Sequence, residues 1–207
     1  MNNKKTKLMK KVVLSLASSA LLLTACQKKE EAKVQEEPAP VESTTPAVSS
    51  IQHQLQWTAY KLPEKAGVKG TFSKIDLYTK HLGEASLEAE LNHADFNISS
   101  ATVSSGDPTR DTKLKDFFFA KMLGDIKGSF GEFKDEKVPV TITMNEVTKE
   151  VPFTYRKNGD TLVIQGKIDI VKDFSANTAF QSIAEACKDL HQNKTWPDVD
   201  IEAKFYQ

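Results

Sequence analysis

The sequence predicts an all-β fold, a closed antiparallel barrel of eight strands with two short helices. Three observations support this prediction. After the first 50 residues, apolar and polar residues alternate through most of the chain, as they do in strands with one buried face. The run Lys157-Asn158-Gly159-Asp160 separates two such segments and is typical of a β-hairpin turn. Only two segments have helical spacing, and nothing indicates parallel strands joined by crossover helices.

The first 25 residues have the pattern of a bacterial lipoprotein signal peptide. Five lysines precede an apolar run, residues 12–23, that is too short to span a bilayer. The run ends in Leu23-Thr24-Ala25-Cys26, which resembles a lipobox, where the cysteine thiol receives a diacylglycerol and becomes the first residue of the mature protein. The alternative is an ordinary signal peptide cleaved nearby, with Cys26 incidental. We expect lipidation at Cys26.

A lipidated Cys26 would anchor the protein in the cell envelope, because two or more acyl chains hold a protein stably at a membrane. Gln27 follows instead of Asp, which by resemblance to the enterobacterial sorting pattern favours the outer membrane, facing the periplasm. Residues 26–50 are rich in Pro, Ser, Thr and charge and have almost nothing apolar to bury. We expect them to be a disordered tether, spanning roughly 25–30 Å as a flexible coil.

The mature chain is mildly acidic. Residues 1–25 contain five lysines and no acid, so 23 basic and 28 acidic residues remain, a formal charge of −5. Nucleic acids bind to clustered Lys and Arg, so we expect no nucleic-acid partner.

Residues 51–207 are long enough for one domain with a single core. The alternating segments, in chain order, are 55–59, 68–72, 87–91, 138–144, 151–155, 162–170 and 199–205. The first helix begins at Asp107, a good N-cap followed by Pro, and carries an apolar stripe through Leu114 and Met122. The second runs from 176 to about 190. Cys187 lies on its apolar stripe, which favours a buried small hydrophobe over a reactive thiol.

Four motifs occur in order along this domain. They are 68–72 (Val-Lys-Gly-Thr-Phe), 95–100 (Asp-Phe-x-Ile-Ser-Ser), 109–118 (Thr-Arg-Asp-x-x-Leu-x-x-Phe-Phe) and 146–153 (Glu-Val-Thr-Lys-Glu-Val-Pro-Phe). Together they resemble the YceI-like family of periplasmic, lipocalin-like proteins, over residues 51–207. The resemblance implies a closed eight-stranded lipocalin-like barrel whose interior holds a long amphiphilic isoprenoid, such as a polyprenyl chain or a quinone.

A barrel of eight strands is just wide enough to be filled by side chains or to hold one slim ligand. The 11 Phe residues suit either a packed core or an apolar tunnel, and the resemblance favours the tunnel. We expect the following residues to bind the ligand: Phe72, Leu91, Phe117, Phe118, Ile142, Phe153, Tyr155, Ile164 and Ile168. Phe117, Phe118 and Phe119 are consecutive on a helix, so they cannot all face one side. Arg110 and Asp111 could hold a headgroup or form an ion pair that fixes the helix start.

The sequence has no nucleophile elbow, zinc-protease helix, phosphate-binding glycine loop or paired-cysteine motif, so we predict no enzyme and no catalytic residues. The four histidines have no metal-ligand spacing. The acids Asp198, Asp200 and Glu202 indicate the solvated face of the last strand, with a Ca²⁺ site as the alternative. We predict no metal and no cofactor other than a bound polyisoprenoid, quinone-like or other lipid.

The predicted function is that of a membrane-anchored periplasmic binding protein, a monomer or homodimer, which holds a long amphiphilic isoprenoid or similar lipid inside a β-barrel. Its role would be in transport, storage or stress. The alternative is a non-enzymatic envelope interaction protein with a packed barrel and no ligand.

Overall fold

The computed structural model of the protein describes residues 47–206. The predicted signal peptide, Cys26 and most of the predicted tether lie outside the described residues. The sheet begins at Ala47, earlier than the predicted domain start at Ile51, because the short strand β1 (Ala47–Val48) pairs with Thr79 and Tyr78.

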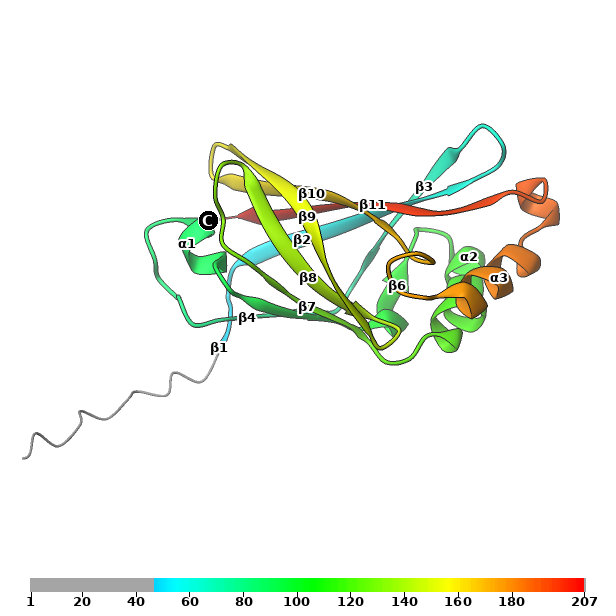
Figure 1. The fold of residues 1–207 in the computed structure, drawn as a ribbon, viewed down its shortest axis with the longest axis horizontal. Helices are drawn as coiled ribbons and strands as arrows, with labels where there is room; N and C mark the ends of the chain where they lie inside the picture. The colour runs from blue at the N-terminus through cyan, green and yellow to red at the C-terminus, as the bar shows by residue number, and fades with distance from the viewer. Residues whose placement is uncertain (1–46, 207) are drawn as a thin grey trace, which may run out of the picture. The chain divides into compact units, whose positions relative to one another are not determined.

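Eleven antiparallel strands form one sheet, in the order β1-β4-β5-β7-β8-β9-β10-β11-β2-β3-β6 (Figure 1). The other ten strands are β2 (Gln52–Lys61), β3 (Ala66–Phe72), β4 (Ile75–Thr79), β5 (Asp95–Ile98), β6 (Val103–Ser104), β7 (Ile126–Phe130), β8 (Lys137–Met144), β9 (Val147–Asn158), β10 (Thr161–Asp169) and β11 (Thr195–Tyr206). The predicted hairpin at Gly159 joins β9 to β10, with Asn158 paired to Thr161.

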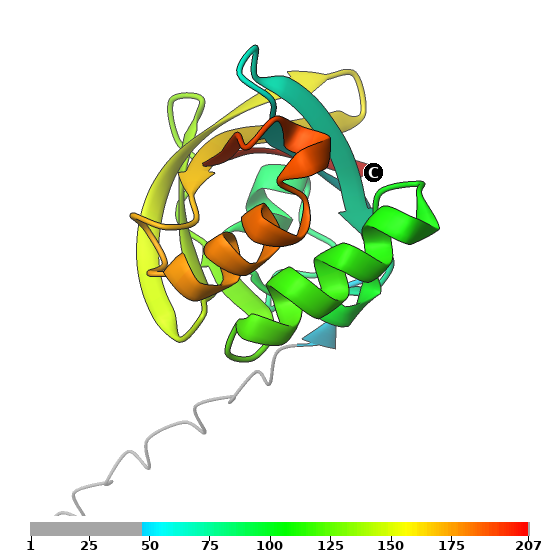
Figure 2. The same ribbon diagram turned by 90° about the vertical axis from the view of Figure 1, so that its right-hand side faces the viewer.

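The sheet curls around a core, as the view along its axis shows (Figure 2). The all-β antiparallel class is confirmed, whereas a closed barrel of eight strands is not. Within the described residues the strand order ends at β1 and β6, and these two strands do not pair. The segment 99–104 runs alongside the end of β3 and its connection to β4. The Ser73 amide donates to the Thr102 carbonyl and the Ser99 amide to the Lys74 carbonyl, both at 3.1 Å.

Residues 87–91, predicted as a strand, instead form the helix α1 (Leu87–Leu91). The Ser86 hydroxyl accepts from the Ala89 amide at 3.2 Å and caps the helix. Leu87 and Leu91 are four residues apart and both buried. A segment this short fits period two and period 3.6 equally well, so alternation alone could not distinguish the two structures.

The two predicted helical regions are present, but neither is a uniform α-helix. Asp107 caps α2 (Pro108–Lys113) as expected, accepting from the amides of Thr109 and Arg110. The chain continues as a π-helical turn, η2 (Leu114–Phe118), and a 3₁₀ turn, η3 (Phe119–Lys121). The second region is α3 (Asn177–Ala186) followed by the 3₁₀ turn η4 (Asp189–His191). A further 3₁₀ turn, η1 (Ser100–Thr102), precedes β6.

The helices lie at the two ends of the curled sheet. The α2 and α3 regions lie across one end, side by side, and α1 lies at the other (Figures 1 and 2). None of the helices in residues 47–206 is long and apolar enough to cross a membrane. The interior between the two ends contains the apolar cavities described next.

Candidate ligand-binding cavity

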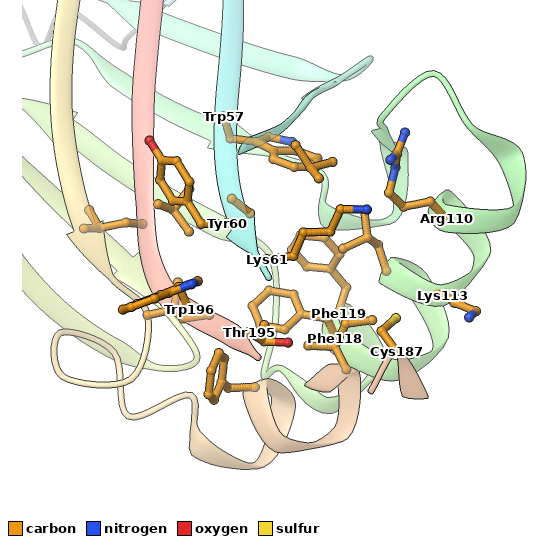
Figure 3. A pocket seen from close by; sticks show the side chains of 18 of the residues that line it. Trp57, Tyr60, Lys61, Arg110, Lys113, Phe118, Phe119, Cys187, Thr195 and Trp196 are labelled. Atoms are coloured by element: carbon orange, nitrogen blue, oxygen red, sulfur yellow. The ribbon is translucent and has the colours of Figure 1, made fainter. Parts of the chain in front are cut away.

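A cavity of about 180 Å³ lies beneath the α2 and α3 regions, against β2, β3 and β11. Its deep wall is apolar and includes Ala59, Val68, Leu114 and Ile183. Figure 3 shows how the labelled side chains from the strands and from the helices surround this space. We call it the outer cavity.

The π-helical turn brings aromatic rings to the outer cavity. Phe118 is buried, and its ring centroid lies 5.0 Å from that of Phe119 in an edge-to-face arrangement. Phe119 in turn packs edge-to-face on Phe72 of β3, at 5.7 Å. Phe117 is 41% exposed and does not line the cavity. Two of the three consecutive phenylalanines therefore face the interior and the third faces away, in agreement with the helical argument.

The mouth of the outer cavity carries basic side chains: Lys61, Arg110, Lys113 and His191 are among its lining residues. Lys113 donates to the Ala186 carbonyl at 3.4 Å, which links the α2 region to the end of α3. Burial lowers the pKa of His191 below its ordinary value, and the positive charges of Lys61 and Lys113 lower it further. These basic side chains thus lie beside an apolar interior, and the cationic ends of Arg110 and Lys113 are hydrogen-bonded to protein groups.

Arg110 and Asp111 both contact Ser105. The Arg110 guanidinium donates to the Ser105 hydroxyl at 2.8 Å and to its carbonyl at 3.2 Å. The Asp111 carboxylate accepts from the Ser105 amide at 2.7 Å and from its hydroxyl at 2.5 Å. Burial alone would raise the pKa of Asp111, but these hydrogen bonds hold it below its ordinary value. This pair fixes the start of the helix through Ser105, and Arg110 also reaches the mouth.

A second cavity, of about 110 Å³, lies deeper between the strands, and we call it the inner cavity. Ile142, Phe153 and Ile164 are in its wall. Its far end is packed with aromatic rings, with Phe130 edge-to-face on Phe205 at 5.8 Å. The Phe130 amide donates to the carbonyl of Ala94, just after α1, at 3.0 Å, which ties β7 to this end of the molecule.

The structure distributes the predicted ligand-binding residues as follows. Phe72 and Ile168 line both cavities, Phe118 lines the outer one, and Ile142, Phe153 and Ile164 line the inner one. Leu91, Phe117 and Tyr155 line neither. Leu91 is fully buried on α1, and the Tyr155 ring packs on Phe133 at 5.1 Å. These three residues form no part of the cavity walls.

Several cavity residues were missed by the sequence analysis. Trp57 and Ala59 belong to the alternating segment 55–59, so the period-two pattern already placed them on the inner face. Met144 likewise ends the alternation of 138–144. Of the basic residues at the mouth, Arg110 was a candidate for holding a headgroup. Lys61, Lys113 and His191 gave no signal, because they become neighbours only when β2 meets the α2 and α3 regions.

Cys187 is buried at the end of α3 and lines the outer cavity, in agreement with its interpretation as a small hydrophobe.

The acidic residues on β11 form salt bridges with lysines. Asp198 pairs with Lys65 at 2.7 Å and Asp200 with Lys167 at 3.1 Å. The Tyr60 hydroxyl also donates to Asp200, and this bond raises the pKa of Tyr60 to about 12. These acids therefore lie on the outer face of β11, paired with lysines. Residues 47–206 contain no group of three or more His, Cys, Asp or Glu residues placed to hold a metal.

The fold and the cavities define a class, the all-β proteins that enclose an apolar cavity within a curled antiparallel sheet. The YceI-like domain family model matches residues 44–205, and the chain belongs to this family.

The solved structures similar to the chain include the following two. One is a polyisoprenoid-binding domain from Saccharophagus degradans implicated in plant cell wall breakdown, with a TM-score of 0.53 and 12% identity, covering 78% of this chain and 95% of that one. The other is BcnA from Burkholderia cenocepacia, with a TM-score of 0.50 and 19% identity, covering 75% and 96%. At these identities the likeness shows the fold alone. No curated protein matches the chain significantly.

Proposed function

We propose that this protein is a non-enzymatic binding protein that holds a long amphiphilic isoprenoid, or a similar lipid, with its apolar chain in the cavities and its headgroup at the basic mouth. The observation that carries this proposal is the outer cavity of about 180 Å³. The cavity opens at its mouth, so water enters it when no ligand is bound, and the apolar walls return none of the hydrogen bonds that this water makes in bulk. A bound apolar chain would release this water and bury the walls, which stabilises the bound state.

The chemistry of the walls favours an apolar chain as the occupant. The side chains of Val68, Leu114 and Phe118 offer dispersion contacts and no buried hydrogen-bond partner, so a polar ligand would lose its hydration without compensation. A hydrocarbon chain gains about 0.8 kcal/mol for each methylene buried. The polyisoprenoid named for the Saccharophagus degradans domain is a ligand of this type.

The packed-barrel alternative, an interaction protein without a ligand, fits these cavities less well, because well-packed interiors contain few voids larger than a water molecule. The cavities therefore favour a bound ligand over a packed barrel.

The test is to fill the outer cavity from its wall. Ala59→Phe adds a ring on the inward face of β2, whereas Gln56→Phe adds the same ring on the exposed face of the same strand. We expect Ala59→Phe to lose the co-purifying lipid while keeping or raising its thermal midpoint, and Gln56→Phe to keep the lipid. A lipid-free wild type, or an Ala59→Phe protein that is destabilised and still loaded with lipid, would contradict the proposal.

We further propose that Cys26 is lipidated and anchors the protein at the outer membrane, facing the periplasm. The support is the sequence Leu23-Thr24-Ala25-Cys26 after a basic start and an apolar run. Cys26→Ala should abolish lipidation, so the precursor should accumulate and the detergent-soluble mature form should disappear. A Cys26→Ala protein that is still processed and still membrane-bound would rule out this anchor.

A further inference from the structure

The outer and inner cavities share part of their walls. Six residues line both, and they come from six strands, β2, β3, β7, β8, β10 and β11. In chain order they are Trp57, Phe72, Ile126, Met144, Ile168 and Ile201. We call this ring the waist. It lies where the two cavities meet, so a chain that continues from the outer cavity into the inner one must pass it.

Trp57 has the largest side chain of the waist, and it lies directly opposite Gly70 in the β2–β3 pair. A Cβ atom at Gly70 would stand 2.0 Å from Cζ2 of the indole, so the ring occupies the space that any other residue would fill. The indole N–H donates to the Thr71 carbonyl at 3.4 Å, beyond the usual 2.7–3.2 Å. Packing on Gly70 therefore holds the ring in place more than hydrogen bonding does, so displacing the ring requires no strong polar interaction to be broken.

The volumes indicate what each side of the waist can hold. A cavity of about 150 Å³ binds one benzene molecule. The outer cavity, about 180 Å³, therefore accepts only a short apolar segment, and the inner one, about 110 Å³, accepts less. A ligand with a long apolar chain can therefore be held only if the two cavities join into one.

We propose that Trp57 determines the length of the apolar chain that this protein binds. Short chains occupy the outer cavity and leave the indole in place, whereas longer chains displace it and continue into the inner cavity. This inference rests on the proposed function, because it concerns the same cavities. The size of the inner cavity then limits how far the chain extends.

Isoprenoid alcohols of increasing length, from geraniol through farnesol and geranylgeraniol to solanesol, test this proposal on the full chain. The chain has two tryptophans, so in a Trp196→Phe background the intrinsic fluorescence reports on Trp57 alone. Trp57 also lines the outer cavity, so we expect geraniol to shift the emission slightly and the longer alcohols, which displace the indole, to shift it much more.

Two variants test the length preference directly. Trp57→Phe opens the waist, so the affinity for geranylgeraniol should rise about tenfold while that for geraniol stays within a few-fold, since single methylenes in apolar pockets change affinity by about 10–200-fold. Ile142→Phe fills only the inner cavity, so it should weaken geranylgeraniol about tenfold and spare geraniol.

An equal effect of either variant on all chain lengths, or an equal spectral response to every alcohol, would overturn the role of Trp57. If Trp57→Phe fails to fold, Ile142→Phe and the fluorescence titration decide the question. Failure of every alcohol to bind would overturn the proposed function itself and this inference with it.

Discussion

The indole of Trp57 lies over the backbone of Gly70, its direct partner on the neighbouring strand, where a Cβ atom would stand 2.0 Å from the ring. The same relationship recurs inside the sheet. Phe96 lies over Gly128, and Phe153 lies over Gly166, with Cβ positions 2.4 Å from each ring. Glycine is required at these positions for space, so that an inward aromatic ring can lie across the adjacent strand.

Gly70→Ala should therefore lower the free energy of unfolding by about 1–3 kcal/mol, the usual cost of overpacking. The new methyl group would meet both the indole and the Ser104 carbonyl, which stands 2.6 Å from the Cβ position. Gly67→Ala on the same strand is the control, because its nearest neighbour is the Thr58 side chain at 3.1 Å. Urea unfolding measures both, and equal losses in the two variants would show that the contact with Trp57 is unimportant.

Glu146 occupies the turn between β8 and β9 with φ of 60°, a left-handed conformation that disfavours side chains. Glu146→Gly should raise the free energy of unfolding by about 0.5–1 kcal/mol, the relief of strain exceeding the added entropy of the unfolded chain. Glu146 is exposed, so no packing changes. The control is Glu150→Gly, in the extended part of β9, which should lose about 0.5–1 kcal/mol. A loss of stability in Glu146→Gly would contradict the prediction.

His191 should make stability depend on pH. Because burial and the charges of Lys61 and Lys113 lower its pKa from the ordinary 6.5, the unfolded chain binds the proton more readily than the folded protein. This part of the stability is present above pH 6.5 and is lost as the pH falls from 6.5 through the lowered pKa. His191→Gln should lose less stability than the wild type between about pH 7 and 5. Identical losses in urea unfolding would refute the role of His191.

The basic mouth should distinguish headgroups. Replacing both Lys61 and Lys113 with Gln should weaken the binding of farnesyl phosphate roughly tenfold, since charge pairs near a protein surface contribute about 1 kcal/mol or more each. Farnesol, which is neutral, serves as the control and should bind about as before. If both ligands weaken equally, the lysines act through packing or folding, and the headgroup does not lie at the mouth.

The sequence predicted most of the sheet, because long strands with one wet face alternate clearly. It missed strands where the alternation is interrupted for packing reasons. In β4 the inward position 79 is a buried Thr, whose hydroxyl donates to the Glu90 carbonyl at 2.6 Å. In β7 the inward position 128 is a Gly beneath Phe96. A polar or missing side chain at an inward position hides a strand from any hydrophobic pattern.

The cavity walls were predictable only in part. Inward residues on long strands, such as Ile142 and Ile164, followed from alternation. Phe117 and Phe118 could not be separated, because the π-helical turn changes which side of the helix faces the interior. Whether an inward side chain lines a void or touches a neighbour depends on residues from distant segments, as Tyr155 against Phe133 shows.

The most direct test of this account is mass spectrometry of an organic extract of the purified wild-type protein, with the amount of lipid compared with the amount of protein. The account predicts about one amphiphile with a long apolar chain per protein molecule, enriched over the lipids of the membrane from which it was purified. An extract with no such species, or with lipids only in the proportions of that membrane, would contradict it.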